Sequence, residues 1–331
     1  MAEGGAPWSA ATILSGGDAQ AFANGPSVLQ LQVPFFFTRA GFEKSYQTGL
    51  LTVQKDLEDE LWVLGQDADT TMIREQIGGV RPGVAALYSK EYIAAWDNIV
   101  SAMKPAQYFN DLAAFGTFTK APSPWKMLLL EVRKNTTFTG GTGAAKSMAV
   151  DRIKSRLGTA AQLMPTGGGS IDAGQEISSY FKPLNDYVGT GKEAAAIDEF
   201  IAAVKTAGQT VIAARSAGGG AAGDAVQAQM ATATAAVQAA GAGAPPMLQS
   251  FVQDTARGGS SAQSSAVQGA VSQGYASVVL PACKSATQDR YPFFATATDD
   301  ASVAEVIRFF GNGGMMDGFV RDRLMPLLDT G

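Results

Sequence analysis

The sequence contains no histidine and a single cysteine, Cys283. Without imidazole, Ser-His-Asp triads, Cys-His dyads and zinc motifs that need a histidine ligand are excluded. One cysteine permits neither an intrachain disulfide nor a cysteine-rich metal cluster. The chain also lacks a run of about 20 apolar residues, which a membrane-spanning helix needs, and its first residues lack the basic and apolar regions of a signal peptide. Two interpretations stay open, a cytosolic protein or a fragment of a longer one.

Charge is sparse, at 17% of residues, and the formal net charge of the 331-residue chain is −5. An acidic chain has no cationic field to neutralise a phosphate backbone, so we expect no nucleic acid partner. The apolar fraction of 46% is typical of a packed protein, and 38 glycines indicate many turns. The length favours one long domain or two subdomains.

Apolar spacings of three and four predict that helices dominate. Thr38 is placed to cap a first helix that ends near Gly65, and Ser123 followed by Pro124 is typical of another helix start. An extended segment is expected only at 28–33, where Leu29, Leu31 and Val33 alternate with polar residues. The helical stripes are Leu50, Val53, Leu57, Leu61 and Leu64; Tyr88, Tyr92, Trp96, Ile99 and Met103; the nearly all-apolar 125–132; and Val303, Val306, Ile307 and Phe310.

From Gly140 onward, glycine-rich stretches separate Ala-, Gln- and Thr-rich segments that still have helical composition. We predict an all-α, two-lobed helical bundle with at most a short β-ribbon near the N-terminus. Its expected divisions are an N-terminal helical lobe at 1–139, a Gly/Ala-rich helical lobe at 140–280, and C-terminal helices at 281–331.

Two glycine-rich segments resemble nucleotide-binding motifs but lack their context. Residues 140–147 depart from G-x-x-x-x-G-K-S at Ala145, and the segment before them is predicted to be a helix where a phosphate loop needs a strand. Residues 218–223 match G-x-G-x-x-G, but the four apolar residues before them make a thin strand, and no acidic residue follows at the ribose-binding distance. We interpret both as interhelical linkers and expect no cofactor.

Other candidate groups have plainer structural explanations. The S-x-x-K pairs Ser123/Lys126 and Ser101/Lys104 lack the companion motifs of penicillin-recognising enzymes. The acidic run at 56–60 could supply paired carboxylates, but its spacing is typical of a solvated helix face. We expect Trp62, Trp96 and Trp125 to be core residues. We therefore assign no catalytic, cofactor-binding or metal-binding residues.

Four passages, in this order, resemble the IcmF/TssM family of type VI secretion systems. Residues 33–65, VPFFFTRAGF…ELWVLG, are similar to its P-x-(Y/F)-T-x-x-G-(F/Y) opening and E-x-W-V-L-G close, and LYSKEYIAAWDNIV and PSPWKMLLLEVRKNT follow at 87–100 and 122–136. Residues 289–330 resemble the family's RYPF…FG-x-G-G-x-x-D-x-F block, and Phe181-Lys182-Pro183-Leu184 resembles a further landmark. These passages cover roughly 40% of the chain; the Gly/Ala-rich middle matches no pattern.

The resemblance implies a non-enzymatic scaffold in the periplasmic part of an inner-membrane protein. Transmembrane helices and a cytoplasmic domain would precede residue 1, and a β-domain that binds the outer-membrane lipoprotein TssJ would follow residue 331. The implied partners are TssJ through that β-domain, TssL through the membrane or cytoplasmic parts, and further copies of the chain. A periplasmic glycan hydrolase that uses carboxylates is the alternative.

Overall fold

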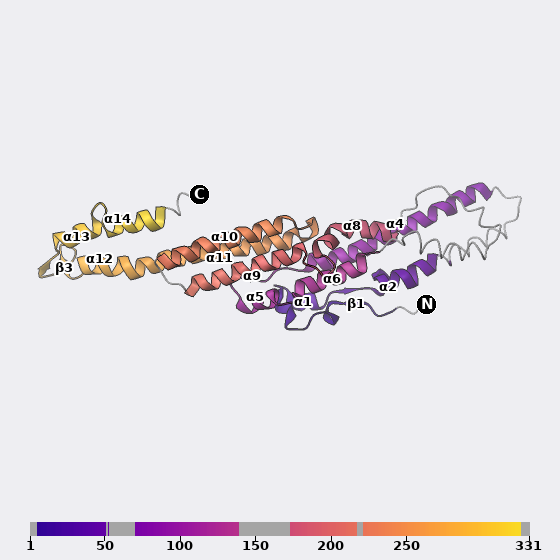
Figure 1. Cartoon of the computed structure of the whole chain (residues 1–331), viewed down its shortest axis with the longest axis horizontal. Coiled ribbons are helices and arrows are strands. Elements are labelled where there is room, and N and C mark those ends of the chain that lie inside the picture. Colours follow the sequence, from indigo (N-terminus) through magenta and orange to yellow (C-terminus); the bar gives the residue numbers. More distant parts are fainter. Residues whose placement is uncertain (1–4, 51, 53–69, 139–172, 217–220, 326–331) are drawn as a thin grey trace. The chain divides into compact units, whose positions relative to one another are not determined.

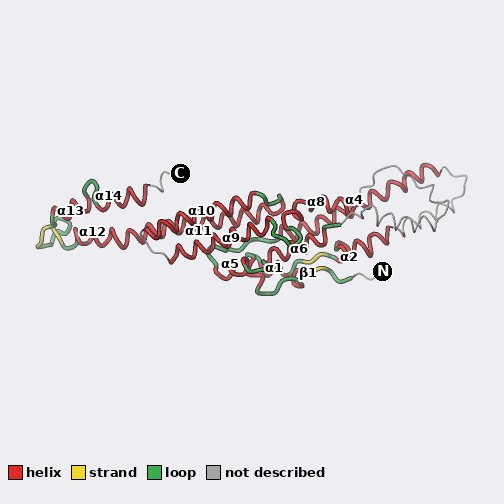
Figure 2. Tube along the Cα trace, viewed as in Figure 1, coloured by secondary structure: helices red, strands yellow, loops and turns green. Residues whose placement is uncertain are grey.

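The computed structural model describes residues 5–50, 52, 70–138, 173–216 and 221–325. They group into two compact units. Unit 1 comprises Met1–Ala202 and Ala240–Thr255, and unit 2 comprises Ala203–Ala239 and Ala256–Gly331. Helix is the dominant secondary structure in both (Figures 1 and 2). The all-α prediction is confirmed, whereas the division at 139 and 280 stays a prediction.

The strands of the described residues are two residues long each. Near the N-terminus, β1 (Trp8–Ser9) pairs antiparallel with β2 (Gln32–Val33), which is the short ribbon that the sequence predicts. In unit 2, β3 (Arg290–Tyr291) pairs in parallel with β4 (Asp299–Asp300), which the sequence does not predict.

Six described α-helices lie wholly within unit 1. They are α1 (Gly25–Leu29), α2 (Arg39–Gly41), α4 (Thr70–Ala102), α5 (Leu112–Thr119), α6 (Pro124–Thr136) and α8 (Ala173–Val188), with a π-helical stretch at Phe42–Tyr46. Three long helices, α9 (Ala196–Ser216), α10 (Ala221–Ala242) and α11 (Gln249–Gly274), contribute residues to both units. Unit 2 continues with a π-helical stretch at Tyr275–Val279, α12 (Leu280–Thr287), α13 (Val303–Phe310) and α14 (Met315–Phe319).

The core of unit 1 forms where the sequence places its second and third apolar segments. The five stripe residues from Tyr88 to Met103 are buried, and α4 ends at Ala102, just before Pro105. In α6, every residue from Trp125 to Val132 is buried or half-buried. Trp96 and Trp125 are fully buried, and the Phe251 ring stacks on Trp125 with centroids 4.5 Å apart. The core assignment of both tryptophans is confirmed, while Trp62 lies outside the described residues.

The predicted strand at 28–33 is wrong over its first half. Val28 and Leu29 belong to α1, and only Gln32 and Val33 pair as a strand. Pro26 explains the difference, because its fixed φ angle suits the first turn of a helix. A local helix start therefore outweighs the alternation of Leu29, Leu31 and Val33.

Both predicted helix starts lie where expected, but only one side chain caps. The Thr38 hydroxyl accepts a hydrogen bond from the Gly41 N–H at 3.1 Å. Ser123 occupies the N-cap of α6 with an extended backbone, yet its hydroxyl makes no capping bond. The Ser123 side chain is buried instead, so the capping role predicted for its hydroxyl is wrong. The remainder of the predicted first helix, at 53–65, lies outside the described residues.

The C-terminal part of unit 2 has a small core. Val279, Ala286 and Phe309 are its buried residues, and Met315, Met316 and Phe319 pack against them. The bounds of α13 and its end at Gly311 agree with the predicted apolar segment. Of its predicted stripe, however, Val303, Ile307 and Phe310 are exposed, and Val306 is half-buried.

Candidate functional site

Neither serine–lysine pair has the arrangement of an acylating site. The Lys126 Nζ lies 2.6 Å from the Asp198 carboxylate, so its charge is neutralised within unit 1. The Ser123 Oγ is buried and has no hydrogen-bond partner among the described residues. The Ser101 hydroxyl is exposed and donates to the carbonyl of Asn98 at 3.4 Å. Within the part of the chain that the structure describes, no base therefore contacts either serine.

The segment before the 218–223 motif is helical, not extended. Residues 211–214 lie inside α9, and α10 begins at Ala221. A dinucleotide-binding turn requires a strand before its glycines, so the linker interpretation fits better. Residues 218–220, the motif at 140–147 and the acidic run at 56–60 lie outside the described residues. The segment described before residue 140 is α6, which ends at Thr136.

Asp18 is a buried carboxylate, and its contacts keep it charged. Burial raises its pKa, but the hydrogen bond and charge of Lys120 and two hydrogen bonds from Ser15 outweigh burial, so the pKa is lowered. The Ser15 N–H and hydroxyl both donate to Asp18 Oδ2 at 2.8 Å. A carboxylate that stays ionised has no proton to give as a general acid, so Asp18 fits a structural ion pair better. Over the described ranges, no group of three or more His, Cys, Asp or Glu side chains has the geometry of a metal site.

A hollow on unit 2 lies between α9 and α10. Its lining is Thr206, Thr210, Ala228, Gln229, Thr232, Ala233 and Ala236. Hydroxyl, amide and methyl groups offer neither a charge nor a titratable proton, so this hollow has no means of acid–base chemistry.

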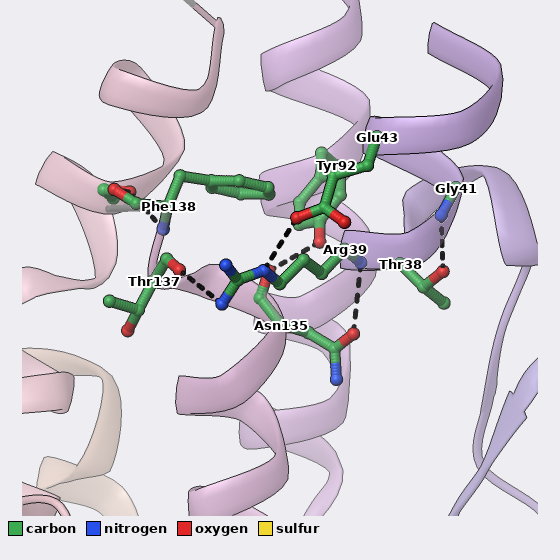
Figure 3. A network of polar contacts seen from close by, with 9 residues as sticks. Thr38, Arg39, Gly41, Glu43, Tyr92, Asn135, Thr137 and Phe138 are labelled. Carbon is green, nitrogen blue, oxygen red and sulfur yellow. Dashed lines mark hydrogen bonds and ion pairs between the residues drawn. The ribbon is translucent and has the colours of Figure 1, made fainter. Parts of the chain in front are cut away.

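The most elaborate polar arrangement centres on Arg39, and we call it the Arg39 network (Figure 3). The Arg39 N–H donates to Asn135 Oδ1 at 3.1 Å, and its guanidinium contacts Glu43 at 3.0 Å and the Thr137 carbonyl at 3.4 Å. The Tyr92 hydroxyl donates to the Asn135 carbonyl at 2.6 Å. The network thus joins α2, α4 and the end of α6 by hydrogen bonds to backbone and side chains.

An aromatic cluster lies beside this network. The Tyr88 ring stacks on Tyr46 with centroids 3.9 Å apart and meets the edge of Phe36 at 4.9 Å. Its hydroxyl donates to the Phe36 carbonyl at 2.6 Å, and the Trp96 indole N–H donates to the Phe37 carbonyl at 2.7 Å. Buried Tyr and Trp side chains commonly find such a polar partner. The segment from Phe36 to Tyr46 is therefore fastened to α4 at several points.

Burial also affects the pKa values of the Tyr88 and Tyr92 hydroxyls. Burial, reinforced by neighbouring ionisable groups, raises the pKa of Tyr88 and of Tyr92 well above the usual value. Both stay neutral at physiological pH, so they donate hydrogen bonds and do not exchange protons. The geometry indicates a rigid joint between helices, without the features of a reaction centre.

Sequence reasoning missed Arg39 and Asn135. Arg39 lies inside the passage that carries the family resemblance, while Asn135 lies in a polar run that the sequence assigned to a helix end. The signal available for Asn135 is its place at the end of an otherwise buried helix, since a buried amide needs partners. Its pairing with Arg39 spans 96 positions of sequence, which a local pattern cannot predict.

Comparisons with known proteins agree with the resemblance. Residues 1–137 match the family described as IcmF-related: Intracellular multiplication and human macrophage-killing. The chain is 27% identical over 316 residues to the type VI secretion system component TssM1 of Pseudomonas aeruginosa. That alignment covers 89% of this chain and 28% of the relative, so the chain spans little more than a quarter of the relative's length. No solved structure matches the chain.

Proposed function

Because the chain belongs to the IcmF/TssM family of type VI secretion components, we propose that it is a scaffold within that apparatus. In this proposal it acts through protein–protein contacts between inner-membrane and outer-membrane components. It lies in the periplasm as part of an inner-membrane protein and carries no catalytic site.

One observation favours a scaffold over the alternatives: the polar groups of the Arg39 network bind other parts of the chain. Arg39, Tyr92 and Asn135 direct their hydrogen bonds to the backbone and side chains of neighbouring helices. Catalytic groups instead converge on a space that a substrate can enter. All the residues of the network lie within 1–137, the part of the chain that matches the family model. A joint of this kind ties neighbouring helices together, as a scaffold requires.

The partners in this proposal are the lipoprotein TssJ, the inner-membrane protein TssL and further copies of the same chain. None of the described helices is both long enough and apolar enough to cross a membrane. In this proposal TssJ contacts a β-domain of the full-length protein, and TssL contacts its membrane or cytoplasmic parts.

Cysteine labelling of the full-length protein in its own cells tests the compartment. Leu112 is 60% exposed at the start of α5, so Leu112→Cys supplies one accessible thiol in a background where Cys283 and any cysteine outside residues 1–331 are serine. We expect a membrane-impermeant maleimide to label it once the outer membrane is permeabilised, while a cytoplasmic control protein stays unlabelled. Labelling only after lysis of the inner membrane would place this part in the cytoplasm and overturn the proposal.

An assay for soluble fragments released from peptidoglycan tests the hydrolase alternative. We expect the purified chain to release none. The matched comparison is a variant with Asp56→Asn and Glu60→Gln, which removes two charges from the acidic run. Release that this variant abolishes would contradict the scaffold proposal and favour a carboxylate-dependent enzyme.

A further inference from the structure

The turn between α12 and α13 exposes three aromatic rings, and we call Tyr291, Phe293 and Phe294 the aromatic turn. These side chains are 55%, 45% and 46% exposed. The turn begins at β3, which packs beside α12 (Figure 1). Large aromatic side chains are usually well buried, and exposed apolar surface on a folded protein commonly marks a binding site.

Hydrogen bonds hold the backbone of the aromatic turn. The Phe294 N–H donates to the Arg290 carbonyl at 2.9 Å, and the Ala301 N–H donates to the Tyr291 carbonyl at 2.8 Å. The Arg290 guanidinium pairs with Glu305 at 3.0 Å, which ties the turn to α13. A surface that is ordered before it binds loses less conformational entropy on binding. The exposed rings therefore stand on a support that suits recognition.

The register of β3 and β4 places a carboxylate beside one of these rings. Tyr291 is the strand partner of Asp300, and Arg290 is the strand partner of Asp299. Neighbouring strands lie about 5 Å apart, and successive side chains of a strand point to opposite faces. Tyr291 and Asp300 therefore share one face of the pair, whereas Arg290 and Asp299 share the other. Both Tyr291 and Asp300 are exposed.

The chain does not neutralise the charge beside Tyr291. Within the described residues Asp300 forms no ion pair, whereas Arg290 on the opposite face is paired with Glu305. The face of an aromatic ring attracts a cation, and a carboxylate accepts the N–H groups of a guanidinium in a strong, charge-assisted hydrogen bond. Arginine can make both contacts at once, because its planar guanidinium stacks on rings while it donates at its edge.

The same charges disfavour other occupants of this face. A phosphate group or an anionic lipid surface would be repelled by Asp299 and Asp300. A second copy of this chain would bring the same acidic turn and a formal net charge of −5, and like charges oppose association. A wholly apolar segment could cover Phe293 and Phe294, but it would take water from the Asp300 carboxylate without giving it a partner, which is unfavourable.

We propose that Tyr291 and Asp300 bind an arginine side chain from a basic segment of a partner protein. The guanidinium stacks on the Tyr291 ring and donates to the Asp300 carboxylate. Phe293 and Phe294 offer apolar area to the neighbouring residues of the bound segment. Exposed contacts of this kind are individually weak, so we expect a dissociation constant of roughly 0.1–1 mM for a short peptide. The site adds to the proposed scaffold role and does not depend on it.

Fluorescence anisotropy of a labelled peptide of alternating glycine and arginine, titrated with the purified chain, tests the proposal. The matched peptide carries citrulline, which keeps the shape of arginine without its charge, and we expect it to bind at least about fivefold more weakly. This comparison uses the wild-type chain, so it does not require any variant to fold. Absence of saturable binding by the arginine peptide, or equal binding of the two peptides, would overturn the proposal.

Three substitutions test which residues form the site. Tyr291→Leu keeps apolar bulk and removes the ring, and Asp300→Asn removes the charge, so each should weaken binding of the arginine peptide about three- to fivefold. Asp299→Asn is the matched control, because it removes the same charge one residue away on the opposite face. We expect it to change the affinity by less than about 1.5-fold in 150 mM salt, where charges are screened beyond about 8 Å. Equal weakening by the two asparagine substitutions, or no effect of Tyr291→Leu, would contradict the assigned site.

Discussion

Replacing Asn135 by alanine should lower the free energy of unfolding of unit 1 by about 2–3 kcal/mol. The Asn135 side chain is buried and accepts the Arg39 N–H at 3.1 Å while donating to the Glu131 carbonyl at 2.9 Å. That N–H belongs to the first turn of α2, where a helix offers no internal acceptor. Leaving a donor of this kind unpaired costs about 1–3 kcal/mol, and the lost side-chain volume adds to it.

Tryptophan emission during urea unfolding measures this change in unit 1 alone. All four tryptophans of the chain, at positions 8, 62, 96 and 125, lie within Met1–Ala202. The signal therefore does not follow unit 2. Asn98→Ala is the matched control, because Asn98 is an exposed asparagine on α4. Its effect should stay within about 0.5 kcal/mol, as for most surface substitutions.

The reasoning fails if the two alanine variants unfold at the same urea concentration. That outcome would mean that water replaces the amide at no cost, and that the Arg39 network does not stabilise unit 1. Tyr92→Phe provides a second test, because it removes the 2.6 Å hydrogen bond to the Asn135 carbonyl and keeps the aromatic ring. We expect it to cost about 1 kcal/mol.

Two further predictions use the same unfolding assay. Gly41→Ala should destabilise unit 1 by at least about 2 kcal/mol, because an added Cβ would lie 1.9 Å from the Phe35 carbonyl oxygen; Gly116→Ala, where nothing lies within 4 Å, should instead stabilise by up to about 1 kcal/mol. Asp18→Asn should cost about 1–3 kcal/mol at pH 7. Since the pKa of Asp18 is lowered in the folded state, this difference should persist above pH about 4 and disappear as pH falls through the folded pKa. Equal stabilities of the two glycine variants, or a pH-independent difference at Asp18, would contradict these assignments.

Periodicity predicted the core of unit 1 because its signal is local. A stripe such as Tyr88, Tyr92 and Trp96 marks one face of a helix, and in a compact unit that face is buried. Capping patterns are also local, and they located both helix starts, because Thr38 and Ser123 directly precede the first residues of α2 and α6. They failed for the Ser123 hydroxyl, because burial of that side chain depends on residues distant in sequence.

The start of α4 shows a second limit of local reasoning. Proline is a poor residue for a helix interior, yet the helix runs from Thr70 through Pro82 to Ala102. Proline removes one backbone hydrogen bond and clashes with the preceding turn, but these are local costs, and a long helix can continue when its other contacts are favourable. A sequence pattern indicates the cost of a helix-breaking proline, but it does not indicate the favourable contacts that offset this cost.

The contrast between α4 and α13 shows how an apolar stripe acquires a function. Both helices carry apolar residues at helical spacing, and the sequence gives no sign of which stripe the chain itself will cover. In unit 1, aromatic rings and hydrogen bonds from Phe36–Tyr46 cover the α4 stripe. In the C-terminal part of unit 2, the buried core of Val279, Ala286 and Phe309 leaves Val303, Ile307 and Phe310 of α13 exposed. Because exposed apolar area favours association, the tertiary contacts that cover a stripe, and not the stripe alone, decide whether it becomes core or surface.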